Sequence, residues 1–339
     1  MRIFKASELK TFEQLASLSQ TSLKRVMANF LKKYYPKVVE TKDYIFAEGS
    51  IPIALVAHMD TVFMSPPSEI FYDEKHNVMW SPQGLGADDR AGVFAITQIV
   101  RSGLRPHIIF TTDEEIGAIG ATKLALLDCP FEDLRYMIQL DRRGSNDCVF
   151  YDCENPEFTK YIESFGFEWS YGSFTDISEL GPAWKVAAVN LSVGYRDEHT
   201  TSEVLFVNHL LSTINKVKKM LTETDIPSFE FIPSEYYYQW MFNPKTVDVA
   251  YGYSDSIKCA GCKKYFMEEE MFPAVMLDHS TSFYCPDCLV DKVSWCNNCG
   301  SAFEKYSPEA PTLGTCPNCV DMKVKEQTNG TNTENSAKV

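Results

Sequence analysis

Histidine and carboxylate side chains recur along the first 200 residues in five short clusters. The clusters are His58-Met59-Asp60, Asp88-Asp89, Glu114-Glu115, Asp141 and His199. Imidazole nitrogens and carboxylate oxygens are the ligands that catalytic zinc takes, with one position left open for water or substrate. Each cluster follows a short apolar run or a glycine-rich turn, and open α/β sheets place their chemistry at the carboxyl ends of strands. This order predicts a two-metal hydrolase site.

The first cluster pairs an imidazole with a carboxylate. His58 and Asp60 are two residues apart at the end of an expected strand, so their side chains share a face. One imidazole nitrogen can bind a metal while a carboxylate accepts a hydrogen bond from the other and fixes the tautomer. We therefore expect His58 as a ligand and Asp60 as its support; the alternative is a polar pair without a metal.

The second and third clusters each hold two adjacent carboxylates. Asp88 or Asp89 could bridge two cations with its two oxygens, or could cap the helix expected to follow. Glu114 and Glu115 follow a buried strand, where paired carboxylates are costly unless cations or protons compensate them. We expect one glutamate to bind metal and the other to act as general base on a metal-bound water. The alternative is a solvated acidic loop.

Asp141 and His199 complete the set. Asp141 ends an expected strand and is followed by Arg142 and Arg143, so it is either a terminal ligand or the partner of an arginine. His199 lies in a loop and would be the second imidazole; the alternative is a surface histidine. Two imidazoles with three carboxylates suit two zinc ions, and manganese or cobalt could take the same positions.

In combination, these residues resemble the di-zinc exopeptidases of clan MH, the superfamily of zinc aminopeptidases, carboxypeptidases and aminoacylases. The resemblance spans about residues 50–205 and is carried by His58-Met59-Asp60-Thr61-Val62, by Gly86-Ala87-Asp88-Asp89-Arg90-Ala91-Gly92, by Asp113-Glu114-Glu115-Ile116-Gly117, by Leu140-Asp141 and by His199-Thr200. It implies an amide-cleaving hydrolase with two catalytic metals.

The resemblance also implies a role for each residue. The implied metal ligands are Asp89 between both metals, His58 and Asp141 at one, and Glu115 and His199 at the other. Glu114 is implied to be the general base, and Asp60 to lie behind His58. The peptide bond after the bridging aspartate, Asp89–Arg90, is expected to be cis.

The aminoacylase and carboxypeptidase branch carries a lid or dimerisation domain between the third acidic ligand and the last histidine. Here only 57 residues separate Asp141 from His199, so the chain resembles the aminopeptidase-like branch without a lid. Asp176 resembles an acidic residue near the substrate in that branch. An aminopeptidase acting on peptides is therefore expected. The alternatives are a deacylase or amidase on a non-peptide amide, and a zinc-ribbon adaptor on an inactive hydrolase scaffold.

Apolar periodicity predicts strands that alternate with helices. Strands are expected at 38–40, 44–47, 53–57, 108–111, 136–140 and 186–191, and helices at two places within 7–35 and at 91–100, 120–127, 156–165 and 202–221. The alternation predicts an α/β fold with a mostly parallel central sheet flanked by helices. We expect residues 1–224 to form the hydrolase domain.

Three further segments are expected after residue 224. Residues 225–256 are rich in aromatics and would be a connector packed on the first domain, or else would line a substrate or partner site. Residues 257–322 contain the clustered cysteines and are expected to form a small zinc-ribbon module. Residues 323–339 have no apolar period and are expected to be disordered.

Eight of the 11 cysteines form four Cys-x-x-Cys pairs. The pairs are Cys259 with Cys262, Cys285 with Cys288, Cys296 with Cys299, and Cys316 with Cys319. Tandem pairs of this kind indicate two structural zinc ions, each held by four thiolates. Consecutive pairs could share an ion, or the first pair could join the third; free thiols are the alternative.

Charge and composition limit the partners and the location. The net charge is −14, and the span from Cys259 to Cys319 has four lysines, no arginine and eight acidic residues. Nucleic-acid binding needs the reverse, so we expect no nucleic acid and instead a protein partner or self-association through the module. No run approaches the roughly 18 apolar residues of a membrane span, and no apolar signal core begins the chain. We expect a cytoplasmic protein with a peptide or acyl-amide substrate.

Overall fold

The computed structural model describes residues 3–234, 256–267, 271–276, 281–298, 302–305, 315–316 and 319. The chain divides into a first unit, Met1–Phe242, and a Cys-rich unit, Asn243–Val339. The aromatic stretch 235–253 and the tail 323–339 lie outside the described residues. Among the described residues, no helix combines the length and the apolar composition that a membrane crossing requires.

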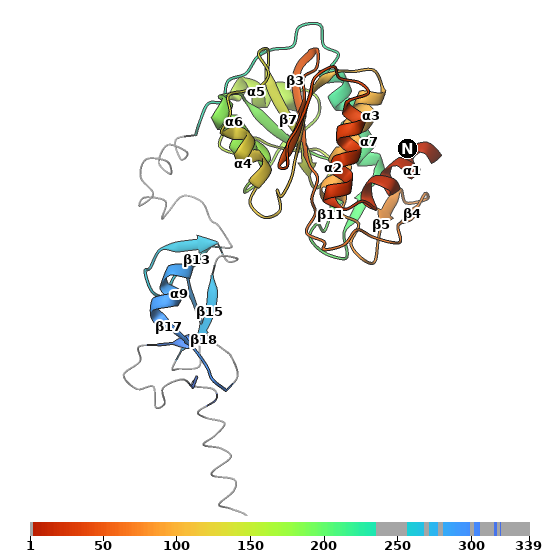
Figure 1. Ribbon diagram of the computed structural model, residues 1–339. Helices are drawn as coiled ribbons and strands as arrows, with labels where there is room; N and C mark the ends of the chain where they lie inside the picture. Colours follow the sequence, from red (N-terminus) through yellow and green to blue (C-terminus); the bar gives the residue numbers. More distant parts are fainter. Residues whose placement is uncertain are drawn as a thin grey trace, which may run out of the picture. The chain divides into compact units, whose positions relative to one another are not determined.

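An eight-stranded sheet forms the centre of the first unit, in the order β1-β2-β6-β3-β7-β10-β8-β9 (Figure 1). Its strands are β1 (Val38–Glu40), β2 (Tyr44–Ala47), β3 (Ile51–His58), β6 (Pro106–Thr111), β7 (Tyr136–Arg142), β8 (Asp147–Val149), β9 (Glu168–Trp169) and β10 (Ala188–Ser192). The four inner strands β6, β3, β7 and β10 are parallel. The pairs β1–β2, β2–β6 and β10–β8 are antiparallel, so the whole sheet is mixed.

Helices cover both faces of this sheet (Figure 1). They are α1 (Ala6–Ala16), α2 (Gln20–Leu31), α3 (Ala87–Arg101), α4 (Ile119–Ala125), α5 (Pro156–Glu163), α6 (Asp176–Trp184) and α7 (Val207–Met220). Alternate residues of the inner strands point to opposite faces. Leu55 and Ala57 thus join a core with α1, α2, α3, α5 and α7, while Ala54 and Val56 join a second core with α4 and α6. The predicted α/β fold is confirmed.

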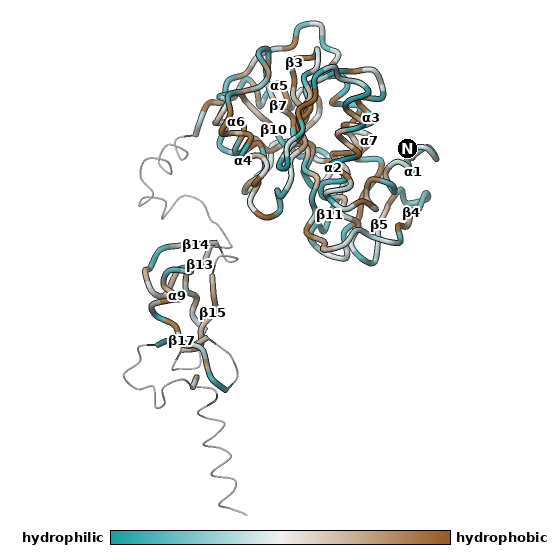
Figure 2. The backbone as a smooth tube through the Cα atoms, viewed as in Figure 1, coloured by the Kyte–Doolittle hydropathy of each residue, from teal (hydrophilic) through white to brown (hydrophobic). Residues whose placement is uncertain are grey.

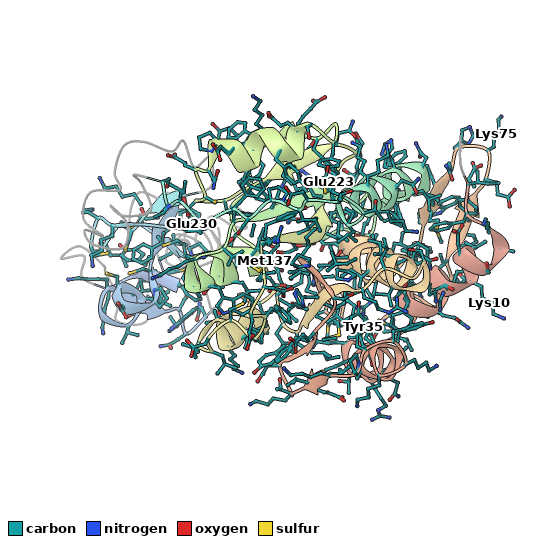
Figure 3. All side chains as sticks on the ribbon, turned by 90° about the horizontal axis from the view of Figure 1, so that it is seen from above. Lys10, Tyr35, Lys75, Met137, Glu223 and Glu230 are labelled. Atoms are coloured by element: carbon teal, nitrogen blue, oxygen red, sulfur yellow. The ribbon has the colours of Figure 1, made fainter. Side chains whose placement is uncertain are left out.

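The apolar character of the inner strands explains their place in the sheet. All described residues of β6 and β10 are buried, as are the last six residues of β3, which is the pattern of strands covered on both faces. Figure 2 shows the hydrophobic colour running along β3 and β7. In Figure 3 the buried Met137 of β7 lies within the unit, whereas the exposed Lys10 and Lys75 lie at its edge.

The segment 202–221 differs from its prediction as a single helix. Its start forms strand β12 (Val204–Phe206), and helix α7 begins only at Val207. β12 pairs with β11 (Tyr195–Arg196) and β5 (Val78–Trp80), and β4 (Phe71–Asp73) completes this second, antiparallel sheet. The Val-Leu-Phe run fits both helical and strand periods, and pairing with β5 decides in favour of the strand.

Residues 226–234 pack on the first unit. Phe229 is buried, and its amide donates a hydrogen bond to the Arg135 carbonyl at 3.0 Å. The Ala187 amide donates to the Phe229 carbonyl, also at 3.0 Å. Residues 226–234, which begin the expected connector, therefore pack as part of the first unit.

The described residues of the Cys-rich unit form short strands and the short helix α9. They are β13 (Ser256–Lys258), β14 (Tyr265–Met267), β15 (Phe272–Val275), β16 (Thr281–Tyr284), α9 (Pro286–Lys292), β17 (Val293–Trp295) and β18 (Ala302–Glu304). β13 pairs with β14, and the other four strands form a sheet in the order β16-β15-β18-β17. Its buried cores are small and contain the cysteines themselves.

Candidate metal centre

The predicted histidines and carboxylates meet at the carboxyl edge of the parallel strands. His58 is the last residue of β3, and Asp141 is the next-to-last residue of β7. Glu115 lies in the turn after β6, and His199 in the turn between β11 and β12. The start of α3 supplies Asp88. Five separate segments thus contribute one side chain each.

These side chains form two groups that share one carboxylate. In the His58 group (His58, Asp88 and Asp141), the His58 Nε2 atom lies 3.1 Å from Asp88 Oδ1 and 3.5 Å from Asp141 Oδ1. In the His199 group (His199, Asp88 and Glu115), the His199 Nε2 atom lies 3.4 Å from Asp88 Oδ2 and 3.0 Å from Glu115 Oε2. Asp88 therefore presents one oxygen to each group.

The spacing fits two metal ions. Two ligand atoms that are each about 2.1 Å from a tetrahedral zinc ion lie about 3.4 Å apart, close to the distances within both groups. Glu115 Oε1 is buried and has no hydrogen-bond partner among the described residues. A buried carboxylate oxygen without a partner is expected where an ion completes the site.

Asp88, not Asp89, lies between the two groups, which corrects the expectation for Asp89. The fully buried Asp89 carboxylate accepts hydrogen bonds from the backbone amides of His58 (3.3 Å) and Gly92 (2.9 Å). Asp89 thus caps the regular part of α3. The cis peptide bond is Asp88–Asp89, so the expected position at Asp89–Arg90 was wrong by one residue. The two aspartates are neighbours in the sequence, so their surroundings do not show which one lies between the groups. Only the three-residue spacing from Asp89 to Gly92 marks Asp89 as the helix cap.

Asp60 connects His58 to the turn that carries both glutamates. Its Oδ1 atom lies 3.3 Å from His58 Nδ1 and also accepts the Glu114 amide at 3.1 Å. Its Oδ2 atom accepts the Glu115 amide at 3.0 Å. One carboxylate therefore orients both the imidazole and the turn, and the supporting role of Asp60 for a metal ligand stays a prediction.

Glu114 lies beside the His58 group without joining it. Its Oε2 atom is 4.0 Å from His58 Nε2, and the side chain is mostly buried. Burial, together with the negative charges of Asp141 and Asp176, raises the pKa of Glu114 to about 9 against the opposing effect of His58. With this pKa the Glu114 carboxyl holds a proton at neutral pH, and a cation bound next to it would lower the pKa by favouring the charged form.

Asp141 is held by side chains that sequence reasoning missed. Gln139 and Thr175 donate hydrogen bonds to Asp141 Oδ2 at 3.1 and 3.0 Å, and the Tyr195 hydroxyl donates to Oδ1 at 3.1 Å. Gln139 could have been found, because it is two residues before Asp141 on the same strand and so shares its face. Thr175 and Tyr195 come from distant segments and have no such signal.

Several ionisable side chains lie close together in the centre, and their burial and mutual charges shift their pKa values. Burial and the neighbouring Asp88 raise the pKa of Asp141 to about 7, and burial and Asp141 raise the pKa of Asp89 well above its usual range. Hydrogen bonds to Asp88 and Glu115 raise the pKa of His199 to about 11. Carboxylates crowded in this way favour bound cations or protons, which agrees with the geometry of the two groups.

Asp176 and Glu203 are two further buried carboxylates. Asp176 accepts a hydrogen bond from the Thr111 hydroxyl at 2.5 Å and is fully buried at the start of α6. Its Oδ1 atom is buried and has no hydrogen-bond partner among the described residues, and the substrate-binding role expected for Asp176 stays a prediction. Glu203, which no motif indicated, accepts hydrogen bonds from the backbone amides of residues 86–88.

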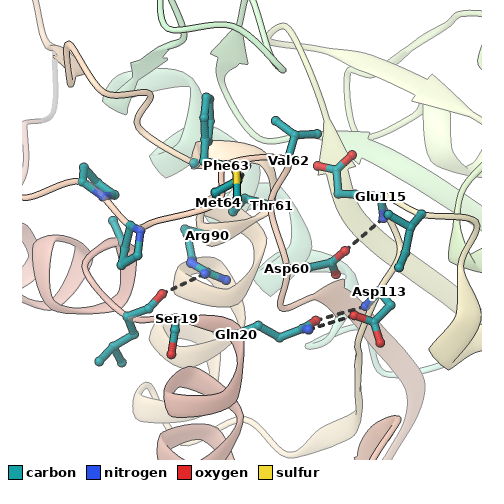
Figure 4. A pocket seen from close by; sticks show the side chains of 16 residues that line it. Ser19, Gln20, Asp60, Thr61, Val62, Phe63, Met64, Arg90, Asp113 and Glu115 are labelled. Carbon is teal, nitrogen blue, oxygen red and sulfur yellow. Dashed lines mark hydrogen bonds between the residues drawn. The ribbon is translucent and has the colours of Figure 1, made fainter.

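A cavity of about 430 Å³ lies beside Glu115 (Figure 4). It is lined by the α1–α2 connection, the loop after β3 and the turn after β6. Gln20 and Asp113 fix its wall, since the Gln20 amide nitrogen donates to Asp113 Oδ1 (2.8 Å) and the Asp113 backbone amide donates to Gln20 Oε1 (3.0 Å). The exposed Met64 and Ile116 side chains give the cavity an apolar part.

The cysteines of the second unit form two clusters of neighbouring pairs. One cluster contains Cys259, Cys262, Cys285 and Cys288, and the other contains Cys296, Cys316 and Cys319, while Cys299 lies outside the described residues. The Cys262 and Cys285 sulfurs are 3.9 Å apart, and thiolates on one tetrahedral zinc lie about 3.8 Å apart. Consecutive pairs thus share a site, as in the sequential alternative.

Comparisons with known proteins identify the fold. No protein-family model and no curated protein matches the sequence. Among solved structures, the chain resembles aminopeptidase PepT from Bacillus cereus and a tripeptidase from Staphylococcus aureus, each at 14% identity and a TM-score of 0.52, over 64% of this chain and 97% of theirs. A TET aminopeptidase from a marine-sediment Thaumarchaeota archaeon gives the same identity and TM-score over 66% and 98%. The chain therefore has the fold of these aminopeptidases.

Proposed function

We propose that this chain is a two-metal hydrolase that cleaves amide bonds and releases the N-terminal residue of peptides. The observation that carries the proposal is the position of Asp88, whose two oxygens face a histidine–carboxylate group on each side. One carboxylate between two such groups is the arrangement that a pair of metal ions requires. The shared fold with aminopeptidases supports the same reaction class.

The residues present fit two divalent ions, zinc by preference and manganese or cobalt as substitutes. The His58 group would hold one ion and the His199 group the other. When bound, such ions polarise a scissile carbonyl and make a water molecule more acidic. Other side chains orient the ligands. Asp60 fixes the His58 tautomer, and hydrogen bonds from Gln139, Thr175 and Tyr195 orient Asp141.

Glu114 is the proton carrier in this proposal. It lies beside the His58 group and does not complete either ligand group. Its carboxylate accepts a proton from the attacking water and returns that proton to the leaving nitrogen. The Asp60 hydrogen bond to the Glu114 amide holds the turn from which the side chain reaches the centre.

The cavity beside Glu115 is proposed to receive an apolar side chain of the substrate. Val62, Met64 and Ile116 are exposed apolar residues that line it, and apolar side chains grouped in a pocket mark ligand sites. A peptide with leucine, methionine or phenylalanine next to the scissile bond suits these residues. The Cys-rich unit is proposed to hold two structural zinc ions through its four cysteine pairs.

The test combines metal analysis with one substitution in the full-length chain. Wild type is expected to contain four metal ions and to release the N-terminal residue of unblocked peptides. Glu114→Gln is expected to keep the metal content and to lose roughly 10²- to 10⁴-fold in kcat, because it removes the proton acceptor. Glu132→Gln, at an exposed position, is the matched control and should match wild type.

Three results would contradict the proposal. An unchanged kcat in Glu114→Gln would exclude Glu114 as the base. A wild-type chain whose first unit binds neither zinc, manganese nor cobalt would favour the adaptor interpretation. Hydrolysis of N-acylated substrates with no activity on free peptides would identify a deacylase instead.

A further inference from the structure

Glu203 is a fully buried carboxylate that takes no part in the reaction described above. Its Oε2 atom accepts hydrogen bonds from the Gly86 amide at 2.6 Å and the Ala87 amide at 3.1 Å, and its Oε1 atom accepts the Asp88 amide at 3.0 Å. Three consecutive backbone amides thus point at one side chain. Only a group that accepts on both oxygens can satisfy all three, and an ionised carboxylate is such a group.

The three amides belong to the segment that delivers Asp88 to the centre. Gly86 has a left-handed backbone, with φ of 66°, and the regular helical hydrogen bonding begins only after Asp89. Residues 87 and 88 begin α3, but their amides, like that of Gly86, have no acceptor in a preceding helical turn, and Glu203 supplies one. These amides would be left without acceptors in a buried place if Glu203 were removed, which destabilises the start of α3.

Glu203 also belongs to the turn that carries His199. Its own amide donates a hydrogen bond to the Thr200 carbonyl at 3.2 Å, and the Thr200 hydroxyl donates to the Asp197 carbonyl at 2.7 Å. Residues 197–203 are thus tied together internally, and the carboxylate ties them to residues 86–88. The two segments that meet in the His199 group are joined by this one side chain.

We propose that Glu203 is a positioning residue that sets the place of Asp88 between the two metal positions. It touches neither metal position nor substrate, and it acts through the backbone of residues 86–88. This inference rests on the proposed two-metal function. Because Asp88 serves both groups, a small displacement of its backbone changes the affinity of both metals. Partners that orient metal ligands commonly affect metal affinity by 10- to 100-fold.

Glu203→Gln isolates this role. The remaining amide oxygen can keep the place of Oε2 and its hydrogen bonds from Gly86 and Ala87. The new NH₂ group then faces the Asp88 amide, donor against donor, so the substitution acts on Asp88 first. Glu203→Asp keeps both acceptor oxygens on a side chain that is one methylene shorter, and it should give a smaller effect.

The experiment measures Mn²⁺ binding by calorimetry on the full-length chain, with zinc left in the thiolate sites. Mn²⁺ prefers carboxylate and imidazole ligands over thiolates, so it reports on the first unit. Glu203→Gln is expected to bind Mn²⁺ at least 10-fold more weakly than wild type. Asn155→Ala is the control for general destabilisation, because Asn155 is a buried cap of α5 outside both ligand groups; it should lower Tm and leave Mn²⁺ affinity unchanged.

Each outcome decides the question. Wild-type Mn²⁺ affinity in Glu203→Gln, even with a lowered Tm, would overturn the positioning role. If Glu203→Gln does not fold, wild-type affinity in Glu203→Asp would overturn it equally. Absence of Mn²⁺ binding in the wild type itself would instead contradict the proposed function, so the two failures are distinguishable.

Discussion

The first unit and the Cys-rich unit both bring metal-binding side chains together, and they do so by opposite means. In the first unit the ligands lie at the edge of a large apolar core built on both faces of a sheet. In the Cys-rich unit the cysteines are themselves members of the small cores, with Cys296, Cys316 and Cys319 buried around Phe303. In the first unit the fold positions the candidate ligands, whereas in the second unit metal is expected to stabilise the fold.

The chemistry of the ligands follows the same division. Four thiolates close a zinc ion off from solvent, whereas imidazole and carboxylate ligands leave positions for water or substrate. The His199 side chain is half-exposed, and with Asp88, Glu115 and Asp141 it lines a pocket of about 140 Å³. An accessible centre needs a rigid support that does not depend on its ions, and a closed centre can supply that support itself.

The largest expected effect comes from removing zinc with a strong chelator. Structural zinc contributes about 10–16 kcal/mol to folding in small metal-dependent domains, so β15, β16 and α9 should unfold while the first unit stays folded. Hydrogen exchange measured by mass spectrometry on the full chain checks this, with zinc re-addition as the control. Equal protection of both units after chelation would break the comparison.

A substitution at Gly92 tests whether the stability of the first unit depends on side-chain packing, as the stability of the Cys-rich unit is expected to depend on zinc. A Cβ there would collide with the Leu140 carbonyl oxygen and lie 2.5 Å from Asp89 Oδ1. Gly92→Ala should therefore lower the free energy of unfolding by roughly 1–3 kcal/mol, measured by urea denaturation. Gly181→Ala is the control, because its Cβ would meet nothing closer than 3.4 Å; equal losses in both variants would refute the packing argument.

A smaller effect is expected at the rim of the cavity. Ile116 is 70% exposed, so Ile116→Ser should fold normally. Loss of its apolar contact should reduce kcat/KM for a leucyl relative to an alanyl substrate by about 10-fold, the range of one or two methylenes. Leu126, which is 82% exposed, is outside the cavity, and Leu126→Ser should leave the ratio unchanged. An unchanged ratio in Ile116→Ser would remove the cavity from the substrate path.

The smallest effect concerns pH. Burial lowers the pKa of His107 below 6.5, despite the nearby Asp133, and the neutral Nδ1 atom accepts the Gly49 amide at 3.1 Å. The unfolded chain therefore binds a proton at higher pH than the folded chain, so stability falls as the pH drops below about 6.5 and levels off below the folded pKa. The slope from this group is at most about 1.4 kcal/mol per pH unit. Urea denaturation of wild type and His107→Gln from pH 5 to 8 measures it; identical slopes would exclude His107.

The fold could be predicted because its signal is local. The apolar runs at β3, β6 and β7 and the helical periods at α1 and α2 match the structure closely. β12 was missed because Val204, Leu205 and Phe206 fit either period, and the partner that decides, β5, is more than 100 residues away in sequence. Such pairing leaves no trace in the segment itself.

The site shows the same limit at the level of single residues. The residue types and their order indicated a two-metal centre, and His58, Glu115, Asp141 and His199 do lie together. The choice between Asp88 and Asp89 depended on which way the backbone turns at the start of α3, which the sequence does not encode locally. The supports, Thr175, Tyr195 and Glu203, come from other segments and were beyond pattern reasoning.

The hydrogen bond from the Asp88 amide to Glu203 joins residues 115 positions apart. At about 5–20 residues per second, a ribosome adds that length in roughly ten seconds. Throughout that interval the growing chain has Asp88 without its anchor and without His199. If the first unit binds two metals as proposed, a chain that ends before residue 199 lacks the imidazole of the His199 group, and one that ends before residue 203 also lacks the side chain that holds the Asp88 amide.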